Sequence, residues 1–279
     1  MNYSLQIDPQ KVSKEIVLFL KKEFSGRKKK IAILGVSGGI DSALTAFLCH
    51  KAGLKLYTIN LPYNAQSADD GNLIANSLKL PEKQILTINI GSSVDGQFKE
   101  IEKKIKLDVV DKGNMMARQR MIVQYALARK LGGLVVGTEN LSEYYLAYFT
   151  LFGDQACDIA PIAGLLKAQV YQLAQYLKVP EKIINKAPSA DLWENQTDEK
   201  ELGFSYIEAD PIIYLNKIKL VSPSKIISQY GLKKTLVNKV MKRIHDTEFK
   251  RKETPKYHIK IKEKNPRQNV GEPWRKMEK

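Results

Sequence analysis

The sequence predicts an α/β fold, in which helices cover both faces of a Rossmann-like parallel β-sheet. Short apolar runs alternate along the chain with longer helical patterns, the order that builds strand–helix–strand units. The first apolar run passes through a glycine-rich turn directly into a helical segment. With 279 residues, 43% of them hydrophobic, the chain is long enough to bury a sizeable core.

Each predicted element follows from its local pattern of side chains. Residues 10–24 repeat apolar side chains at helical spacing, with Val12 and Ile16 on the same face. Residues 54–62 are rich in β-branched and aromatic side chains, which favour strands. In chain order we predict a helix at 10–24, a strand at 31–36, a helix ending near 52, a strand at 54–62, a helix at 67–80, a strand at 84–90, helices at 95–105 and 117–130, and a strand at 131–138.

The C-terminal end of the chain differs in composition from the rest. Beyond about Asp246 the sequence is strongly charged and contains Pro255, Pro266 and Pro273, which is typical of an irregular segment. We therefore predict one domain over residues 1–250, followed by a basic, irregular tail over residues 251–279.

The net charge indicates anionic partners. The chain has 45 lysines and arginines against 30 acidic residues, a formal net charge of +15 at pH 7. Nucleic acid and nucleotide phosphates both fit such a balance. The chain has no C-x-x-C pairs and no recognisable RNA-binding appendage, so small phosphate-bearing molecules are favoured and nucleic acid binding is not expected.

The sequence also indicates a cytoplasmic protein. It has no run of 18 apolar residues that would predict a membrane span, and its first residues have no signal-peptide pattern. Its two cysteines, Cys49 and Cys157, are far apart, and two are too few for a zinc ribbon. We expect both to remain free thiols in small apolar environments.

Residues 31–42, IAILGVSGGIDS, carry the clearest chemical signal. A strand leads through Gly35, Val36, Ser37, Gly38, Gly39 and Ile40 into a helix that begins near Asp41 and Ser42. Glycines let backbone N–H groups approach an anion closely, and the helix N-terminus adds partial positive charge. The pattern therefore predicts a phosphate-binding loop.

Two carboxylates predict a divalent cation beside that loop. Asp41 would be repelled by phosphates unless a metal such as Mg²⁺ bridged them. Thr138 and Glu143 follow the strand predicted at 131–138, and the carboxyl ends of parallel strands share one edge of a sheet. Glu143 together with Asp41 could complete a Mg²⁺ site with phosphate oxygens.

The loop differs from the common glycine fingerprints, because it lacks both G-x-G-x-x-G and the Lys-Ser/Thr ending of the Walker loop. Its S-G-G-x-D-S sequence resembles the pyrophosphate loop of the ATP pyrophosphatase superfamily, also described as adenine nucleotide alpha hydrolase-like, whose members split ATP into AMP and pyrophosphate. Several further segments, in order, resemble the NAD synthetase family: G-N-x-x-A-R-x-R-M at 113–121, G-T-x-N-x-x-E at 137–143, T-x-F-G-D at 150–154, the segment 158–177, and K-x-P-S-A-D-L with D-E-x-x-L-G-x-x-Y at 186–206.

The resemblance, which runs from about residue 10 to 255, implies a reaction. The family joins ammonia to deamido-NAD: the nicotinate carboxylate attacks the α-phosphate of ATP, pyrophosphate leaves, and ammonia then displaces AMP to give NAD. A carboxylate is a poor acylating agent, and adenylation supplies a leaving group. The adenylate must be shielded from water, so we expect residues 186–206 to act as a lid.

The resemblance also implies roles for individual residues. It places Asp41, Lys167 and Asp154 in the catalytic centre, and Asp41 and Glu143 on Mg²⁺. It places Gly35 to Ser42, Thr138, Lys167 and Ser189 on ATP, and Arg118, Asp158 and Lys250 on deamido-NAD. Arginine suits such a ligand from physical chemistry as well, because its planar fork binds carboxylate or phosphate bidentately.

The sequence departs from the family pattern at two positions. Leu151 stands where many members have a lysine, and Phe249 stands where the family often has histidine. Either change could alter affinity for the dinucleotide, and neither affects the residues expected on ATP.

The sequence also predicts the nitrogen source and the assembly of the protein, and it leaves two other functions open. Only about 30 residues precede the first strand, so we expect free ammonia rather than an N-terminal glutaminase domain as the nitrogen source. The resemblance implies a homodimer, with the helical region 113–130 as the expected contact. Two alternatives stay open: another ATP pyrophosphatase, such as a tRNA-modifying adenylating enzyme, and a non-catalytic nucleotide sensor.

Overall fold

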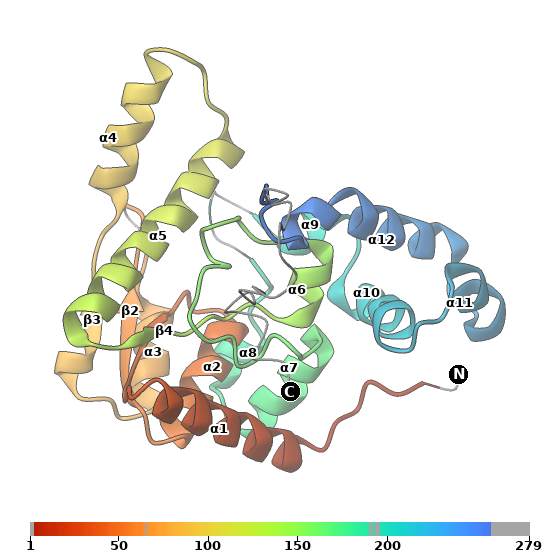
Figure 1. Ribbon diagram of the computed structural model, residues 1–279, viewed down its shortest axis with the longest axis horizontal. Coiled ribbons are helices and arrows are strands. Elements are labelled where there is room, and N and C mark those ends of the chain that lie inside the picture. Colours follow the sequence, from red (N-terminus) through yellow and green to blue (C-terminus); the bar gives the residue numbers. More distant parts are fainter. Residues whose placement is uncertain (1–2, 65, 190–191, 193–195, 258–279) are drawn as a thin grey trace, which may run out of the picture.

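A four-stranded parallel sheet lies at the centre of the computed structural model, in the order β3-β2-β1-β4 (Figure 1). Its strands are β1 (Ile31–Gly35), β2 (Lys55–Asn60), β3 (Ile85–Thr87) and β4 (Leu134–Val135). The structure describes residues 3–64, 66–189, 192 and 196–257. All four strands are parallel, so their carboxyl ends meet at one edge of the sheet.

Alternate residues of β1 enter two different cores. Ala32 and Leu34 belong to the core beneath one face of the sheet, whereas Ile33 belongs to the core on the opposite face, and none of the three is exposed to solvent. Strand side chains point alternately to the two faces, so a strand that is covered on both sides becomes continuously apolar. This burial explains why the first strand has no polar residue in its interior.

Helices α1 (Pro9–Gly26), α2 (Ile40–Lys51) and α7 (Lys167–Tyr176) pack together on one face of the sheet. Asp8 caps α1 by accepting the Lys11 N–H at 3.0 Å, and Pro9 starts the helix. Two shorter helices, α3 (Asp69–Ser77) and α8 (Glu181–Ile184), pack against α2.

The other face is covered by α4 (Gly91–Glu102) and α5 (Val109–Leu131), which run to the tip of a projection in Figure 1. A capping box between Asp108 and Asp111 begins α5, and Gly132 ends it in a left-handed conformation (φ +70°). A 3₁₀ turn (Glu82–Gln84) precedes β3.

The C-terminal helices form a core of their own beside the sheet (Figure 1). They are α6 (Leu141–Leu146), α9 (Asp198–Leu202), α10 (Tyr206–Ile213), a π-helical turn (Tyr214–Ile218), α11 (Pro223–Tyr230), α12 (Lys234–Asp246) and a final 3₁₀ turn (Glu248–Arg251). Helix α7 and helix α6 both contact α10, so this group joins the sheet domain next to the strand ends.

The predicted fold class is confirmed, with differences in the bounds of several elements. The strand predicted at 84–90 contains only the three residues of β3, and the helix predicted at 95–105 begins earlier, as α4. The strand predicted at 131–138 contains only the two ladder residues of β4, because Gly132 and Gly133 form the exit from α5 and Val136 pairs only through an isolated bridge with Ile159. The helix predicted at 117–130 begins eight residues earlier, at Val109 after the Asp108 cap.

The predicted boundary between residues 250 and 251 stays a prediction. The last 3₁₀ turn spans it, and residues 258–279 lie outside the described part of the chain. Among the helices that the structure describes, none combines the length and apolarity needed to cross a membrane.

Candidate active site

The glycine-rich turn between β1 and α2 forms a compact loop at the carboxyl edge of the sheet. Ser37 Oγ accepts the Gly39 N–H at 3.3 Å, and Ser42 Oγ donates to the Gly39 carbonyl at 2.9 Å. Gly38 has φ +76°, and a Cβ on it would lie 2.5 Å from the Cβ of Asp70. Glycine is therefore required at position 38 both by the backbone conformation and by the close approach of α3.

The loop presents backbone donors rather than apolar side chains. Val36 and Ile40 direct their side chains into the core, with 6% and 4% exposure, so only their backbone is available to a ligand. The Gly35 N–H already donates to Gln124 Oε1 at 3.0 Å. No side chain caps Gly39 at the start of the 12-residue helix α2. The first N–H groups of that helix and its dipole can therefore serve an anion.

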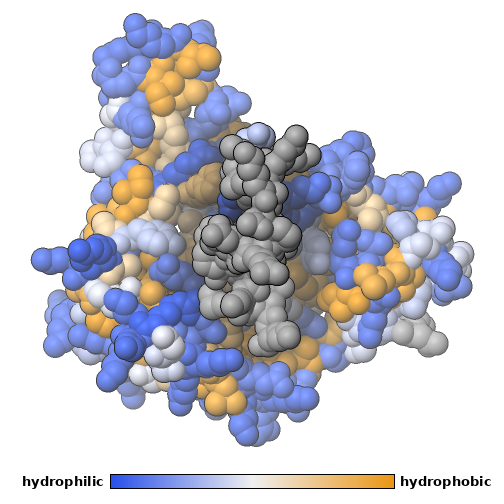
Figure 2. All heavy atoms as spheres, viewed as in Figure 1, coloured by the Kyte–Doolittle hydropathy of each residue, from blue (hydrophilic) through white to orange (hydrophobic). Residues whose placement is uncertain are grey.

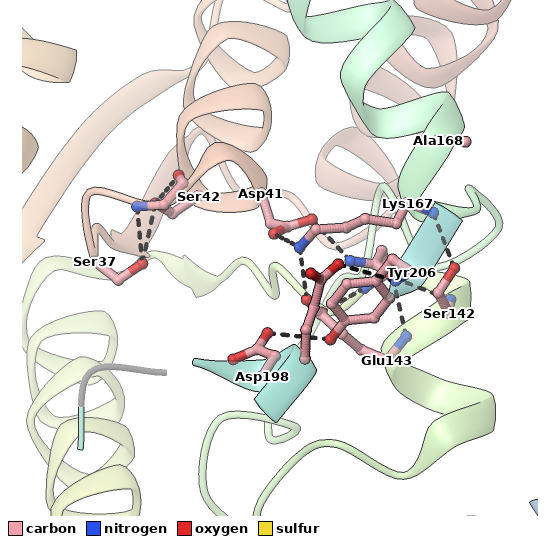
Figure 3. Close-up of polar contacts among 12 residues, drawn as sticks. Ser37, Asp41, Ser42, Ser142, Glu143, Lys167, Ala168, Asp198 and Tyr206 are labelled. Carbon is pink, nitrogen blue, oxygen red and sulfur yellow. Dashed lines mark hydrogen bonds and ion pairs between the residues drawn. The ribbon is translucent and has the colours of Figure 1, made fainter. Parts of the chain in front are cut away.

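Three charged side chains from different elements meet next to this loop (Figure 3). Lys167, the first residue of α7, places its Nζ 2.5 Å from Asp41 Oδ2 on α2 and 3.0 Å from Glu143 Oε1 on α6. The Lys167 side chain is 3% exposed, and those of Asp41 and Glu143 are 15% and 16% exposed. The structure therefore brings together three residues that the sequence predicts in the site, whose roles stay a prediction.

Asn140 contacts the remaining oxygen of each carboxylate. Its Nδ2 donates to Asp41 Oδ1 at 2.8 Å, and its backbone N–H donates to Glu143 Oε2 at 3.2 Å. Its own Oδ1 accepts the N–H groups of Ser142 and Glu143, so the same side chain is the N-cap of α6. All four carboxylate oxygens of Asp41 and Glu143 thus have a donor.

Burial and the neighbouring opposite charges shift the pKa values of this cluster in opposite directions. Burial alone would lower the pKa of the Lys167 ammonium, but the neighbouring Asp41 and Glu143 outweigh it and raise that pKa. Burial raises the pKa of Glu143, with Asp41 adding to the rise and Lys167 opposing it. The lysine therefore stays protonated, and the cluster depends on its positive charge.

The segment predicted as a lid contributes two side chains beneath Lys167. The Lys167 Nζ lies 5.0 Å from the centroid of the Tyr206 ring, a cation–π contact, and Tyr206 is only 2% exposed. The Tyr206 hydroxyl donates to Asp198 Oδ2 at 3.1 Å. Lys167 thus lies between the carboxylates of Asp41 and Glu143 and the end of the 186–206 segment.

The residues predicted on the second substrate lie beyond β4 and around the 150–154 turn. Asp158 Oδ2 accepts the Val135 N–H at 2.8 Å, and Asp154 Oδ1 accepts the Thr150 N–H at 2.8 Å. The exposed Arg118 on α5 donates from Nε to the Leu151 carbonyl at 3.2 Å. Arg118 and Asp154 are therefore brought to the same turn, at one of the positions where the sequence departs from the family pattern.

Lys250 and Ser189 make local contacts. Lys250 donates to the carbonyls of Ala147 and Phe149, at 2.8 Å for Ala147, and its Nζ lies 4.5 Å from the Phe149 ring centroid. Burial lowers its pKa. Ser189 Oγ donates to the Gln196 carbonyl at 2.7 Å. Thr138 is half-buried just beyond β4.

Sequence reasoning missed several residues of the site. Asp70 packs against Gly38 and forms ion pairs with Lys182 and Lys186, both at 2.8 Å, so two cations lie near the phosphate loop. Lys186 begins a matched motif and could have been singled out from it. Asp70 carries no such signal, because an acidic residue in a first helical turn is ordinary.

Glu139 is a second carboxylate that the sequence analysis passed over. Its Oε1 is buried and has no hydrogen-bond partner in the described part of the chain. Burial raises its pKa to about 8, with nearby Asp154 adding to the rise and Lys250 opposing it. This residue lies in the matched G-T-x-N-x-x-E motif, between Thr138 and Asn140, and connects the 150–154 turn electrostatically with the strand end.

The fold and the site together define an α/β protein that binds nucleotide phosphates at the carboxyl edge of a parallel sheet. A family model described as NAD synthase matches residues 12–254. The chain is 40% identical over 256 residues to the NH(3)-dependent NAD(+) synthetase of Fusobacterium nucleatum, covering 89% of this chain and 95% of that protein. The chain belongs to the NAD synthase family.

Solved structures agree with this assignment. The NMN synthetase from Francisella tularensis superposes with a TM-score of 0.79 at 31% identity, covering 91% of this chain and all of that one. The NH3-dependent NAD synthetase from Campylobacter jejuni superposes with a TM-score of 0.73 at 29% identity, covering 90% of this chain and all of that one.

The raised pKa of Glu139 predicts a pH-dependent gain in the variant Glu139→Gln. Between the unperturbed pKa of 4.5 and the folded value of about 8, the unfolded chain loses this proton while the folded chain keeps it. The free energy of unfolding of the unmodified protein therefore declines as pH rises through that window. The variant lacks this decline, so its stability relative to the unmodified protein should rise between pH 5 and pH 8, by up to about 4 kcal/mol at about 1.4 kcal/mol per pKa unit.

Urea unfolding at pH 5 and pH 8 measures this difference. Glu15→Gln, on an exposed position of α1, is the matched control and should show the same change with pH as the unmodified protein. A constant gap between Glu139→Gln and the unmodified protein at both pH values would contradict the assignment.

Proposed function

We propose that this chain is a ligase that converts deamido-NAD, ATP and ammonia to NAD, AMP and pyrophosphate. The observation that carries the proposal is the Asp41–Lys167–Glu143 cluster beside the glycine loop, in a chain that belongs to the NAD synthase family. A carboxylate oxygen of the nicotinate bonds to the α-phosphorus and pyrophosphate leaves. Ammonia then bonds to the acyl carbon, AMP leaves, and a proton is released.

The chain's own groups account for the first step mainly by positioning and charge. The free N–H groups at the start of α2, together with Ser37 and Ser42, would hold the ATP phosphates. The Lys167 ammonium lies at the same edge of the sheet and would neutralise charge on the pyrophosphate as it leaves. We place Thr138 and Ser189 on the rest of ATP, on the strength of the family resemblance.

The residues present fit a Mg²⁺ ion. Asp41 and Glu143 converge on one positive charge, the Lys167 ammonium, so this point already favours a cation. Both ligands are carboxylates, the donor type that Mg²⁺ prefers, and phosphate oxygens and water would supply the rest. The described residues contain no group of three metal-ligating side chains, so the nucleotide has to complete such a site. The metal would bridge and neutralise phosphate charge.

For the dinucleotide we propose Arg118, Asp158 and Lys250 as contacts, with Asp154 near the reacting end. Arg118 is exposed and its fork suits a phosphate or carboxylate. The carbonyl contacts of Lys250 support an indirect role, in which it fixes the 147–149 backbone beside Asp154.

A second candidate substrate for the amidation should be tested in the same assay. One of the matched structures is an NMN synthetase, superposing over all of its length. Leu151 also stands where many family members have a lysine, and that departure could weaken a contact to a dinucleotide. The mononucleotide analogue of deamido-NAD is therefore the second candidate substrate. The family match favours both over a tRNA-modifying activity.

The proposal is tested by incubating the protein with ATP, Mg²⁺ and ammonium, together with either deamido-NAD or its mononucleotide. We expect NAD and AMP in equal amounts from deamido-NAD. Asp41→Asn should reduce AMP formation by at least about 100-fold, because it removes a charge that binds both metal and Lys167. Circular dichroism should show that the variant is folded.

The outcomes separate the alternatives. Faster amidation of the mononucleotide would assign the chain to the second substrate. Product formed with glutamine but not with ammonium would point to a partner glutaminase. Near-normal turnover of Asp41→Asn would contradict the metal and lysine assignments, and AMP formed only when tRNA is added would contradict the proposed function.

Arg118→Ala should weaken binding of deamido-NAD more than binding of ATP. The lost guanidinium is worth about 10-fold in affinity for one charge-assisted contact. Calorimetry with each ligand measures the two effects separately. Arg129→Ala, at an exposed position on the same helix, is the control and should leave both affinities unchanged. Equal weakening of both ligands would show that Arg118 acts on the fold instead.

We also propose a homodimer formed through α4 and α5. Val109, Val110 and Ile122 on α5, together with Ile105 between the two helices, are 51–63% exposed. Apolar side chains gather on the projection that the two helices form (Figure 2). Ile122→Asp should shift the protein towards the monomer in sedimentation velocity, whereas Leu18→Asp, on α1 and equally exposed, should not. A dimer that survives Ile122→Asp would place the contact elsewhere.

A cytoplasmic location is part of the proposal. The described cysteines are free, and Cys49 is fully buried, which raises the pKa of its thiol to about 12. Such inert, unpaired thiols are typical of proteins in a reducing compartment.

A further inference from the structure

Lys167 occupies an unfavourable position in its own helix. It is the first residue of α7, where the helix dipole disfavours a cation. The preceding residue, Leu166, has no side-chain oxygen with which to cap the helix. The ammonium nevertheless has to stay between Asp41 and Glu143, so the backbone beneath it needs support from outside the helix.

That support comes from Asp210 on α10. One carboxylate oxygen accepts the Ala168 N–H at 2.8 Å, and the other accepts the Ser142 hydroxyl at 2.5 Å. Ser142 Oγ in turn accepts the Lys167 N–H at 2.9 Å. The first two N–H groups of α7 are therefore capped by side chains of two other helices; Figure 3 shows Ser142 beside Lys167 and Ala168.

The same contacts also fix the start of α6, which carries the second carboxylate partner of Lys167. Ser142 lies between Asn140, which caps α6, and Glu143, which binds Lys167. A hydrogen bond from Ser142 to Asp210 therefore sets the start of α6 relative to the start of α7. Asp210 and Ser142 are both fully buried, where such bonds are strong and no water can replace them.

We propose that Asp210 is a positioning residue, which acts through Ser142 and the Ala168 N–H to hold Lys167 against Asp41 and Glu143. It also places a negative charge at the N-terminus of α7, where it offsets both the dipole and the adjacent ammonium. Asp210 touches none of the residues proposed on substrate except through these contacts. The inference rests on the proposed function, because it assigns Lys167 to the ATP step.

The direct test is Asp210→Asn, which has nearly the same shape. An amide has one acceptor oxygen, so either the Ala168 N–H or the Ser142 hydroxyl loses its acceptor, and the charge is lost. We expect kcat/KM for ATP to fall by about 10- to 100-fold, the range typical of residues that orient a ligating group. The KM for deamido-NAD should stay within about twofold, because its proposed contacts lie on other elements.

A matched control separates positioning from loss of stability. Ser222 caps α11 in the same C-terminal group of helices, accepting the Lys225 N–H, and lies outside the segments that we propose on substrate. Ser222→Ala should lower Tm, because it removes a helix cap, yet leave kcat and both KM values within about twofold. Equal losses in kcat/KM for ATP in Ser222→Ala and Asp210→Asn would overturn the positioning role.

Ser142→Ala provides a second, independent variant if Asp210→Asn does not fold. It removes the link between Asp210 and the Lys167 N–H, so it should show the same loss selective for ATP. Where both variants fold, the double variant should lose little more than the more affected single variant, because both break one chain of contacts. Unchanged kcat/KM for ATP in Ser142→Ala, or additive losses in the double variant, would overturn the proposal.

Calorimetry with ATP and Mg²⁺ tests the positioning role independently of the proposed function. If the unmodified protein binds ATP but makes no NAD or NMN, the proposed function fails. Weaker ATP binding in Asp210→Asn than in Ser222→Ala would then still support the positioning role, whereas equal binding in both would contradict it.

Discussion

One buried ammonium organises the site of this protein. Lys167 pairs with Asp41 and Glu143, and these three residues come from α7, α2 and α6, which lie far apart in the sequence. Two converging carboxylates would repel each other without a cation between them, and a buried lysine would lose its proton without its partners. Each element can therefore bring its charge to the edge of the sheet only because the other two are present.

The parallel sheet makes it possible for these three side chains to come together. Parallel strands place all their carboxyl ends on one side, so the loop after β1 and the segment after β4 become neighbours although about a hundred residues separate them. The C-terminal helices then close this edge from the side: Tyr206 lies under Lys167, and Asp210 holds the start of α7. The core of the C-terminal helices thus supports the site as well as stabilising these helices.

The polar residues around Lys167 also show why the site is rigid. Asn140 caps α6 and donates hydrogen bonds to the carboxylates of Asp41 and Glu143, and Ser142 forms hydrogen bonds with α10 and α7. Each of these side chains both accepts N–H groups at the start of a helix and holds a residue of the Asp41–Lys167–Glu143 cluster in place. Buried networks in which every group has a partner specify one geometry, because any shift leaves a polar atom unpaired.

The sequence by itself determined the α/β class and predicted the phosphate loop and the residue types of the site, because hydrophobic periodicity, glycine spacing and ordered motifs are local signals. Asp41, Glu143 and Lys167 were found in this way. Only the tertiary structure decided that the lysine lies between the carboxylates, that Asp70 and Lys186 approach the loop, that Glu139 has a buried oxygen, and that Asp210 caps α7. These contacts join residues with no fixed spacing along the chain, so no local pattern encodes them.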